Sequence, residues 1–125
     1  MTQRQETGKV GERAAANYLV GKQYEIIARN VRHASGDEID IIARSREGVL
    51  VFAEVKTMRS GGLRPEDNLH RAKLARLQRS AQFYANRHPE QVGESGWRID
   101  LIAVSLNNNL TDMSSDCSVQ HYENI

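Results

Sequence analysis

Apolar and polar residues follow two different periods along the chain, and the change of period predicts where helix gives way to strand. From residue 9 to residue 22 the apolar side chains recur at helical spacing, which predicts a first helix after a polar arm at residues 1–7. Three β-prone segments follow at residues 24–32, 38–44 and 49–57. The short segment RSREG between the last two is typical of a hairpin turn.

The second half of the chain holds another helix and two more strands. A glycine-rich segment, RSGGLRP, leads to a long helix predicted at residues 65–88, with Pro65 suited to its first turn and Pro89 to its end. A polar turn is predicted at residues 89–96, and strands are predicted at residues 97–105 and 119–122. The order α β β β α β β indicates one α/β domain over residues 8–125, in which helices flank a mixed sheet.

Composition adds limits to this picture. The 125 residues suffice for one hydrophobic core, with 39% apolar and 26% charged residues and no apolar run long enough to cross a bilayer. The polar opening MTQRQETGK has no apolar secretory segment, so we expect a cytoplasmic protein. The single cysteine, Cys117, forms no internal disulfide and has no partners for a zinc site.

Positive charge is concentrated in the middle of the chain. The formal net charge is only +1, which by itself indicates no nucleic-acid partner. Residues 59–88, however, hold seven lysines and arginines against two acids. We therefore expect this region to contact nucleic-acid phosphates. The residues expected to bind are Arg59, Arg64, Arg71, Lys73, Arg76 and Arg79.

Acidic side chains share faces on the two predicted hairpin strands. Strand alternation sets Glu38 and Asp40 on one face with Ile42, and Glu54 and Lys56 on one face of the next strand. A three-residue turn ending in a left-handed Gly48 places Ser45 opposite Val49. The same register places Asp40 opposite Glu54 and Glu38 opposite Lys56.

Two carboxylates that face each other about 5 Å apart repel unless a cation lies between them, and Mg²⁺ suits an oxygen site. The alternative is that these acids are solvated on an exposed face. The apolar side chains on the same face, Ile42, Leu50 and Phe52, favour a covered face instead, where acids need partners.

Other polar residues have weaker signals. Glu12 aligns with the apolar side of the first helix and is a third acid for the site, or pairs with an arginine. We expect its helix to pack over the sheet face that carries Asp40 and Glu54. Lys73 lies among apolar positions of the second helix, which a lysine stem on apolar surface also explains. Arg98 and Asp100 form an ion pair at the sheet's edge in the simplest interpretation. The four histidines, including His121, have no metal-ligand spacing and are expected at the surface.

Five motifs occur in order along residues 8–104. They are G-x-x-G-E-x-x-A from Gly8, R-N-x-R from Arg29, E-I-D-I-I-A from Glu38, V-F-x-E-V-K from Val51 and R-I-D-L-I-A-V from Arg98. Together they resemble the YraN-like family of uncharacterised bacterial proteins. The chain departs from the family pattern in the extra Asp37, in its C-terminal ending and in Lys56, where many relatives carry arginine.

The resemblance implies a PD-(D/E)XK fold, that is, a restriction-endonuclease-like three-layer α/β fold similar to archaeal Holliday-junction resolvases. It implies a catalytic site of Glu12, Asp40, Glu54 and Lys56. One or two Mg²⁺ or Mn²⁺ ions would be held by Asp40, Glu54, the Val55 carbonyl and Glu12, and Lys56 would orient the attacking water.

Three functions are compatible with these sequence features. The first is a metal-dependent endonuclease, selective for branched or structured DNA because phosphate contacts carry no sequence information. The second is a nucleic-acid-binding domain with a vestigial nuclease site. The third is a homodimeric protein-interaction module. Intact acids together with Lys56 favour catalysis among the three.

Overall fold

The computed structural model describes residues 3–32, 37–59, 71–106 and 117–125. Three helices and five strands lie within these ranges. In chain order they are α1 (Gln3–Gly21), β1 (Glu25–Arg32), β2 (Glu38–Arg44), β3 (Leu50–Arg59), α2 (Arg71–Arg87), α3 (Pro89–Val92), β4 (Trp97–Leu106) and β5 (Cys117–Tyr122).

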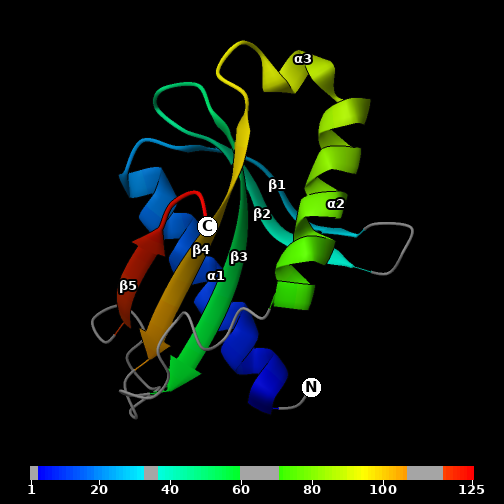
Figure 1. Ribbon diagram of the computed structural model, residues 1–125. Helices are drawn as coiled ribbons and strands as arrows, with labels where there is room; N and C mark the ends of the chain where they lie inside the picture. Colours follow the sequence, from blue (N-terminus) through cyan, green and yellow to red (C-terminus); the bar gives the residue numbers. More distant parts are fainter. Residues whose placement is uncertain (1–2, 33–36, 60–70, 107–116) are drawn as a thin grey trace.

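The strands form one mixed sheet in the order β1-β2-β3-β4-β5. β3 and β4 are parallel, and the other three neighbouring pairs are antiparallel. A parallel pair needs a crossover, and α2 and α3 provide it between β3 and β4 (Figure 1). The predicted α/β class is confirmed, and the layout is consistent with a restriction-endonuclease-like fold.

Each face of the sheet has its own helix and its own core. Ile41 and Ala43 pack with Leu19 of α1 on one face. Ile42 and Phe52 pack with α2 on the other, where the alternation of β2 and β3 directs them. The outer layers of the sandwich are therefore α1 and α2, with the sheet between them.

Helix α1 approaches β3 closely at Gly11. A Cβ atom added there would overlap the side chain of Thr57, so only glycine fits. At Gly8, one turn earlier, an added Cβ would meet nothing within 4 Å. The close contact at Gly11 sets the position of the next residue, Glu12, relative to the sheet.

The boundaries of most elements match the expected ones to within two residues, and those of β2 match fully. Helix α1 begins at Gln3, so residues 3–7 continue the helix and are not a separate arm. Their side chains are polar, but Gln, Arg and Glu are good helix formers without an apolar face. The turn expected at residues 89–96 contains the short helix α3, which Pro89 begins. Residues 65–70 of the predicted second helix lie outside the described residues.

The hairpin between β2 and β3 has the predicted turn and register. Gly48 has a left-handed φ of 93°, and the N–H of Ser45 donates to the Val49 carbonyl at 2.8 Å. Ile42 pairs with Phe52 and Ile41 with Ala53, as the register requires. The three-residue turn thus determines which residues of the two strands meet.

A buried ion pair on β4 joins the C-terminal residues to the core. Asp100 is fully buried and accepts hydrogen bonds from Arg98 Nε at 2.9 Å and from the Asn124 N–H at 3.0 Å. Its other oxygen lies 2.7 Å from Nε2 of His121, whose side chain is only 7% exposed. Two expectations were therefore wrong: His121 is not at the surface, and Asp100 lies on an inner strand and not at the edge, because β5 covers β4.

Candidate metal centre

The centre begins where β2 and β3 separate. The described ladder between them ends at Ile41 and Ala53. Extending this ladder by one residue pair would place Asp40 opposite Glu54. Extending it by two would let the Ile39 carbonyl accept a hydrogen bond from the Val55 N–H. Instead, Oδ2 of Asp40 accepts the Val55 N–H at 2.8 Å. A side chain thus replaces the backbone partner, and the two strand ends diverge around it.

Asp40 departs from the predicted alternation because its side chain reaches sideways to a neighbouring strand. Ile39 packs on the α2 face together with Ile42, although simple alternation predicts opposite faces. Asn30 of β1 lies level with Asp40 in the sheet, because the residues on either side of Asn30 pair with the residues on either side of Asp40. The φ of Asn30 is 53°, a left-handed value that asparagine tolerates. The sheet is irregular on both sides of this carboxylate.

Three carboxylates converge at this irregularity. One oxygen each from Glu12, Glu38 and Asp40 lies within 4.8 Å of the others. Asn30 bridges two of them when its amide nitrogen faces the acids, with distances of 2.8 Å to Glu12 Oε1 and 3.2 Å to Glu38 Oε1. We call Glu12, Glu38 and Asp40 the acidic triad.

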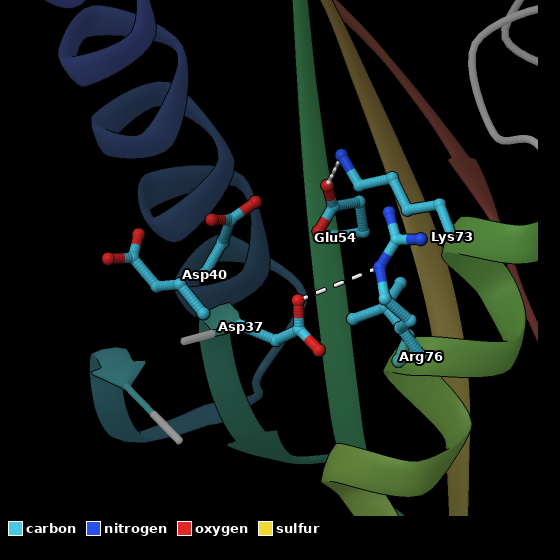
Figure 2. Close-up of a pocket in the computed structure, with 7 residues that line it drawn as sticks. Asp37, Asp40, Glu54, Lys73 and Arg76 are labelled. Atoms are coloured by element: carbon cyan, nitrogen blue, oxygen red, sulfur yellow. Dashed lines mark ion pairs between the residues drawn. The ribbon is translucent and has the colours of Figure 1, made fainter. Parts of the chain in front are cut away.

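Glu54 lies next to the acidic triad but has a cation of its own. It is 6% exposed, and Nζ of Lys73 lies 2.5 Å from its Oε1. Figure 2 shows Lys73 and Arg76 reaching from α2 towards Glu54 and Asp37, and the Arg76 Nε lies 3.6 Å from Asp37 Oδ1. These residues, with Glu38, Asp40 and Leu77, line a pocket of about 250 Å³, which we call the acidic pocket.

The electrostatics of the pocket favour an additional positive charge. Burial and the neighbouring Glu54 carboxylate raise the pKa of Asp40 to about 8, against the opposing effect of the Val55 N–H. Burial and Glu38 likewise raise the pKa of Glu12. Without a cation nearby, Asp40 retains a proton at neutral pH that an isolated carboxylate would lose.

The expectation that Glu12's helix covers the Asp40 and Glu54 face was wrong. Helix α1 packs on the opposite face, with Ala53 in its core, while Phe52 packs against α2. Glu12 nevertheless meets Asp40, because Gly11 brings α1 close to β3 and Asp40 turns sideways out of the face. The acids meet at the separated strand ends, between the two helical layers.

Of the four residues that the resemblance implied for catalysis, three lie together. Glu12 and Asp40 belong to the acidic triad, and Glu54 exerts a Coulombic effect on both. Lys56 is half-buried on β3 and is not among the described residues that line the acidic pocket. The lysine in contact with Glu54 is Lys73.

The residues expected to bind nucleic acid are partly described. Arg71, Arg76 and Arg79 are exposed on α2. Lys73 is half-buried in its ion pair with Glu54. Arg64 and the side chain of Arg59 lie outside the described residues.

Two residues of the site have no role in the prediction from sequence. That prediction places Glu38 on the same face as Asp40 but not among the ligands, and it includes Asn30 only as part of a motif. Their signal was present in the R-N-x-R and E-I-D-I-I-A motifs. Recognising it required the β1–β2 register, which places Arg32 opposite Glu38.

The donor set suits a hard divalent cation. Every donor of the acidic triad and Glu54 is a carboxylate oxygen, the ligand type that Mg²⁺ and Mn²⁺ prefer. The raised pKa of Asp40 and the lysine on Glu54 both indicate excess negative charge. The residues present therefore fit such an ion.

Comparison with known proteins gives a consistent match. The model of the uncharacterised protein family UPF0102 matches residues 11–104. A UPF0102 protein of Symbiobacterium thermophilum is 52% identical over 64% of this chain and 67% of its own length. One from Roseiflexus castenholzii is 41% identical over 82% of each chain. One from Corynebacterium efficiens is 35% identical over 84% of this chain and 82% of its own.

Proposed function

The chain belongs to the uncharacterised protein family UPF0102, and from its acidic pocket we propose that it is a metal-dependent endonuclease acting on structured DNA in the cytoplasm. The observation that supports this best is the convergence of four acids where β2 and β3 separate, with Asp40 fixed on the Val55 N–H. A structural role does not require acids in such numbers, because their mutual repulsion opposes folding.

The proposed metal ligands are Asp40, Glu54 and Glu12, as the resemblance implied, with Glu38 as an addition. The Val55 carbonyl is a further ligand, because a strand residue presents its N–H and C=O to the same neighbour, and the Val55 N–H points to Asp40. When bound, Mg²⁺ or Mn²⁺ would polarise the scissile phosphate and lower the pKa of an attacking water.

The chain's own residues then have separable tasks. Asn30 orients two carboxylates of the acidic triad by donating a hydrogen bond to each. Lys73 forms an ion pair with Glu54 and offsets the charge of that buried carboxylate. Lys56, on the same face of β3 as Glu54, is proposed to orient the attacking water and offset charge on the phosphate.

Helix α2 supplies the proposed contact with the substrate backbone. Its described sequence, RAKLARLQRSAQFYANR, contains five lysines and arginines and no acid. Arg76 also lines the acidic pocket, so a phosphate bound on α2 would lie next to the carboxylates. Such contacts position a nucleic acid without reading its sequence.

The decisive test is an assay of the protein on branched, single-stranded and duplex DNA and on RNA, with Mg²⁺, Mn²⁺ or EDTA. We expect metal-dependent cleavage, best on branched DNA, that Asp40→Asn abolishes. Binding of branched DNA without metal uptake or cleavage would favour the binding-only alternative. A protein that elutes as a dimer and shows no salt-sensitive binding to DNA would favour the interaction module.

A further inference from the structure

The outward side of α2 carries an aromatic residue among its cations. Arg76, Arg79, Phe83 and Arg87 recur at helical spacing and are all exposed. Phe83 is 43% exposed, and the Arg87 guanidinium lies 5.3 Å from the centre of its ring. A positively charged stripe interrupted by an exposed ring is the pattern of a surface on which nucleic-acid bases stack.

Beside Phe83 a second cavity lies between α2 and the sheet. It measures about 180 Å³ and is lined by Val31, Ile39, Ser80, Phe83, Tyr84 and Arg87, among others. Ligand pockets for whole drug-sized molecules measure roughly 300–1,000 Å³, so this cavity suits a single flat group and not a complete cofactor. Its lining combines apolar walls with cations, which matches a base attached to a phosphate.

One wall of the cavity is rigid. The Tyr84 ring stacks on His88, with centroids 4.2 Å apart and an interplanar angle of 28°. It also forms an edge-to-face pair with Phe52, with centroids 5.7 Å apart, and its hydroxyl donates to Gln91 at 2.8 Å. A ring held from three sides loses little freedom when a ligand binds against it.

The cavity also contains a polar group without a partner. Ser80 is 2% exposed and lines the cavity, and its hydroxyl has no hydrogen-bond partner among the described residues. A buried hydroxyl without a partner carries a desolvation cost that a ligand with hydrogen-bonding atoms would remove. The edge of a nucleobase supplies such atoms, whereas an aliphatic chain does not.

We propose that this cavity receives one unpaired nucleobase, stacked on Phe83, while Arg79 and Arg87 contact the adjoining phosphates. Phe83 lies seven residues after Arg76, which lines the acidic pocket, and this spacing is about 10 Å along the helix. A distance of about 10 Å corresponds to about three stacked nucleotides. The inference rests on the nucleic-acid binding in the proposed function, and it specifies the substrate. That substrate has an unpaired nucleotide a few positions from the phosphate that is cut.

The test measures binding in EDTA, where no cleavage occurs. Fluorescence anisotropy compares fluorescein-labelled single-stranded DNA, a duplex with an unpaired overhang and a fully paired duplex. Phe83→Ala should weaken binding to the first two about ten-fold, the size of one lost stacking contact, and change binding to the paired duplex little. Phe83→Trp should restore the affinity. Val20→Ala, which removes another exposed apolar side chain, on α1, should have no effect.

The outcomes separate this inference from the nuclease proposal. If the wild type prefers unpaired DNA and Phe83→Ala leaves this preference unchanged, the result overturns the stacking site but not the nuclease proposal. An equal loss on paired and unpaired DNA would overturn it too, because the ring would then be only part of the general surface. Loss of cleavage in Asp40→Asn, or no cleavage by wild type, leaves the EDTA result standing. A wild type that binds none of the three DNAs also overturns the stacking site, whereas metal-dependent cleavage of branched DNA would still support the nuclease proposal.

Discussion

Asp40 holds the Val55 N–H at 2.8 Å, in the place where the backbone of β2 would otherwise bind it. Because the carboxylate takes over this bond, β2 and β3 separate without leaving a buried N–H unpaired. The same carboxylate lies in the acidic triad. One residue therefore both opens the sheet and supplies the central acid of the space that results.

The stability of the metal-free protein should fall as pH rises from about 4 to about 8. The folded state raises the pKa of Asp40 to about 8 from its ordinary value of 3.8, so between these values the folded protein binds more protons than the unfolded chain. Proton linkage therefore makes the free energy of unfolding decrease with pH, by at most about 1.4 kcal/mol per pH unit. Asp40→Asn should flatten this slope in urea unfolding at pH 5–9. Asp37→Asn, a more exposed acid of the same pocket, should not, and an equal decline in all three proteins would contradict the assignment.

Glu54 and Lys56 should differ in their effects, although two positions separate them on β3. Glu54→Gln removes a proposed ligand, so Mn²⁺ binding measured by calorimetry should weaken and cleavage should fall with it. Lys56→Ala should leave metal binding intact and slow cleavage by about 10²–10⁴-fold, as loss of a group that acts on the attacking water does. Unchanged cleavage in Lys56→Ala would transfer that role to Lys73.

Lys73→Met should destabilise the protein in a way that metal reverses. It leaves the buried Glu54 carboxylate without its cation, at a cost of about 1–3 kcal/mol at pH 8 in EDTA. Mg²⁺ should restore most of the loss in thermal unfolding, since an ion replaces the missing charge. Arg71→Met removes an exposed cation of the same helix and serves as the control. A loss that Mg²⁺ does not reverse would mean that the Lys73 stem, and not its charge, stabilises the fold.

Arg76→Ala and Arg79→Ala together should weaken nucleic-acid binding uniformly across sequences. Each lost phosphate contact should reduce the slope of log K against log[salt] by about one. The measurement is a salt titration of binding in EDTA. A slope equal to that of wild type would place the phosphate contacts on another surface.

Gly11→Ala should cost about 1–3 kcal/mol of stability, because the new Cβ would overlap Thr57 and displace α1 from β3. Gly8→Ala provides a matched control on the same helix. Its Cβ would meet nothing within 4 Å, so replacing a helical glycine should be neutral or stabilise by about 0.5–1 kcal/mol. Denaturant unfolding of both variants checks this. Equal effects would show that α1 adjusts freely over the sheet.

Local chemistry made part of this molecule predictable from its sequence. Gly48 required a left-handed turn, and the turn length then determined that Ile42 faces Phe52. The two acids Asp40 and Glu54 were brought near each other by the same reasoning. Turn geometry and strand alternation act over a few residues, so they can be read without a structure.

The rest of the site depends on contacts between distant segments. The ion pair of Lys73 with Glu54 needs the angle at which α2 crosses β3, and the Asn30 bridge needs a left-handed residue in β1. Local spacing contains neither. Asp40 also turns sideways and does not follow strand alternation. For this reason the helix of Glu12 was predicted on the wrong face of the sheet.

The hydrogen bonds around Asp100 have a consequence for how the protein is made. This buried carboxylate on β4 depends on His121 and on the N–H of Asn124, and the Ile125 N–H donates to the Ile99 carbonyl at 2.9 Å. Before residues 121–125 have been synthesised, a growing chain offers this carboxylate only Arg98, and two of its hydrogen-bond partners are missing. We therefore expect the sheet to gain its full stability only after residues 121–125 have packed against β4.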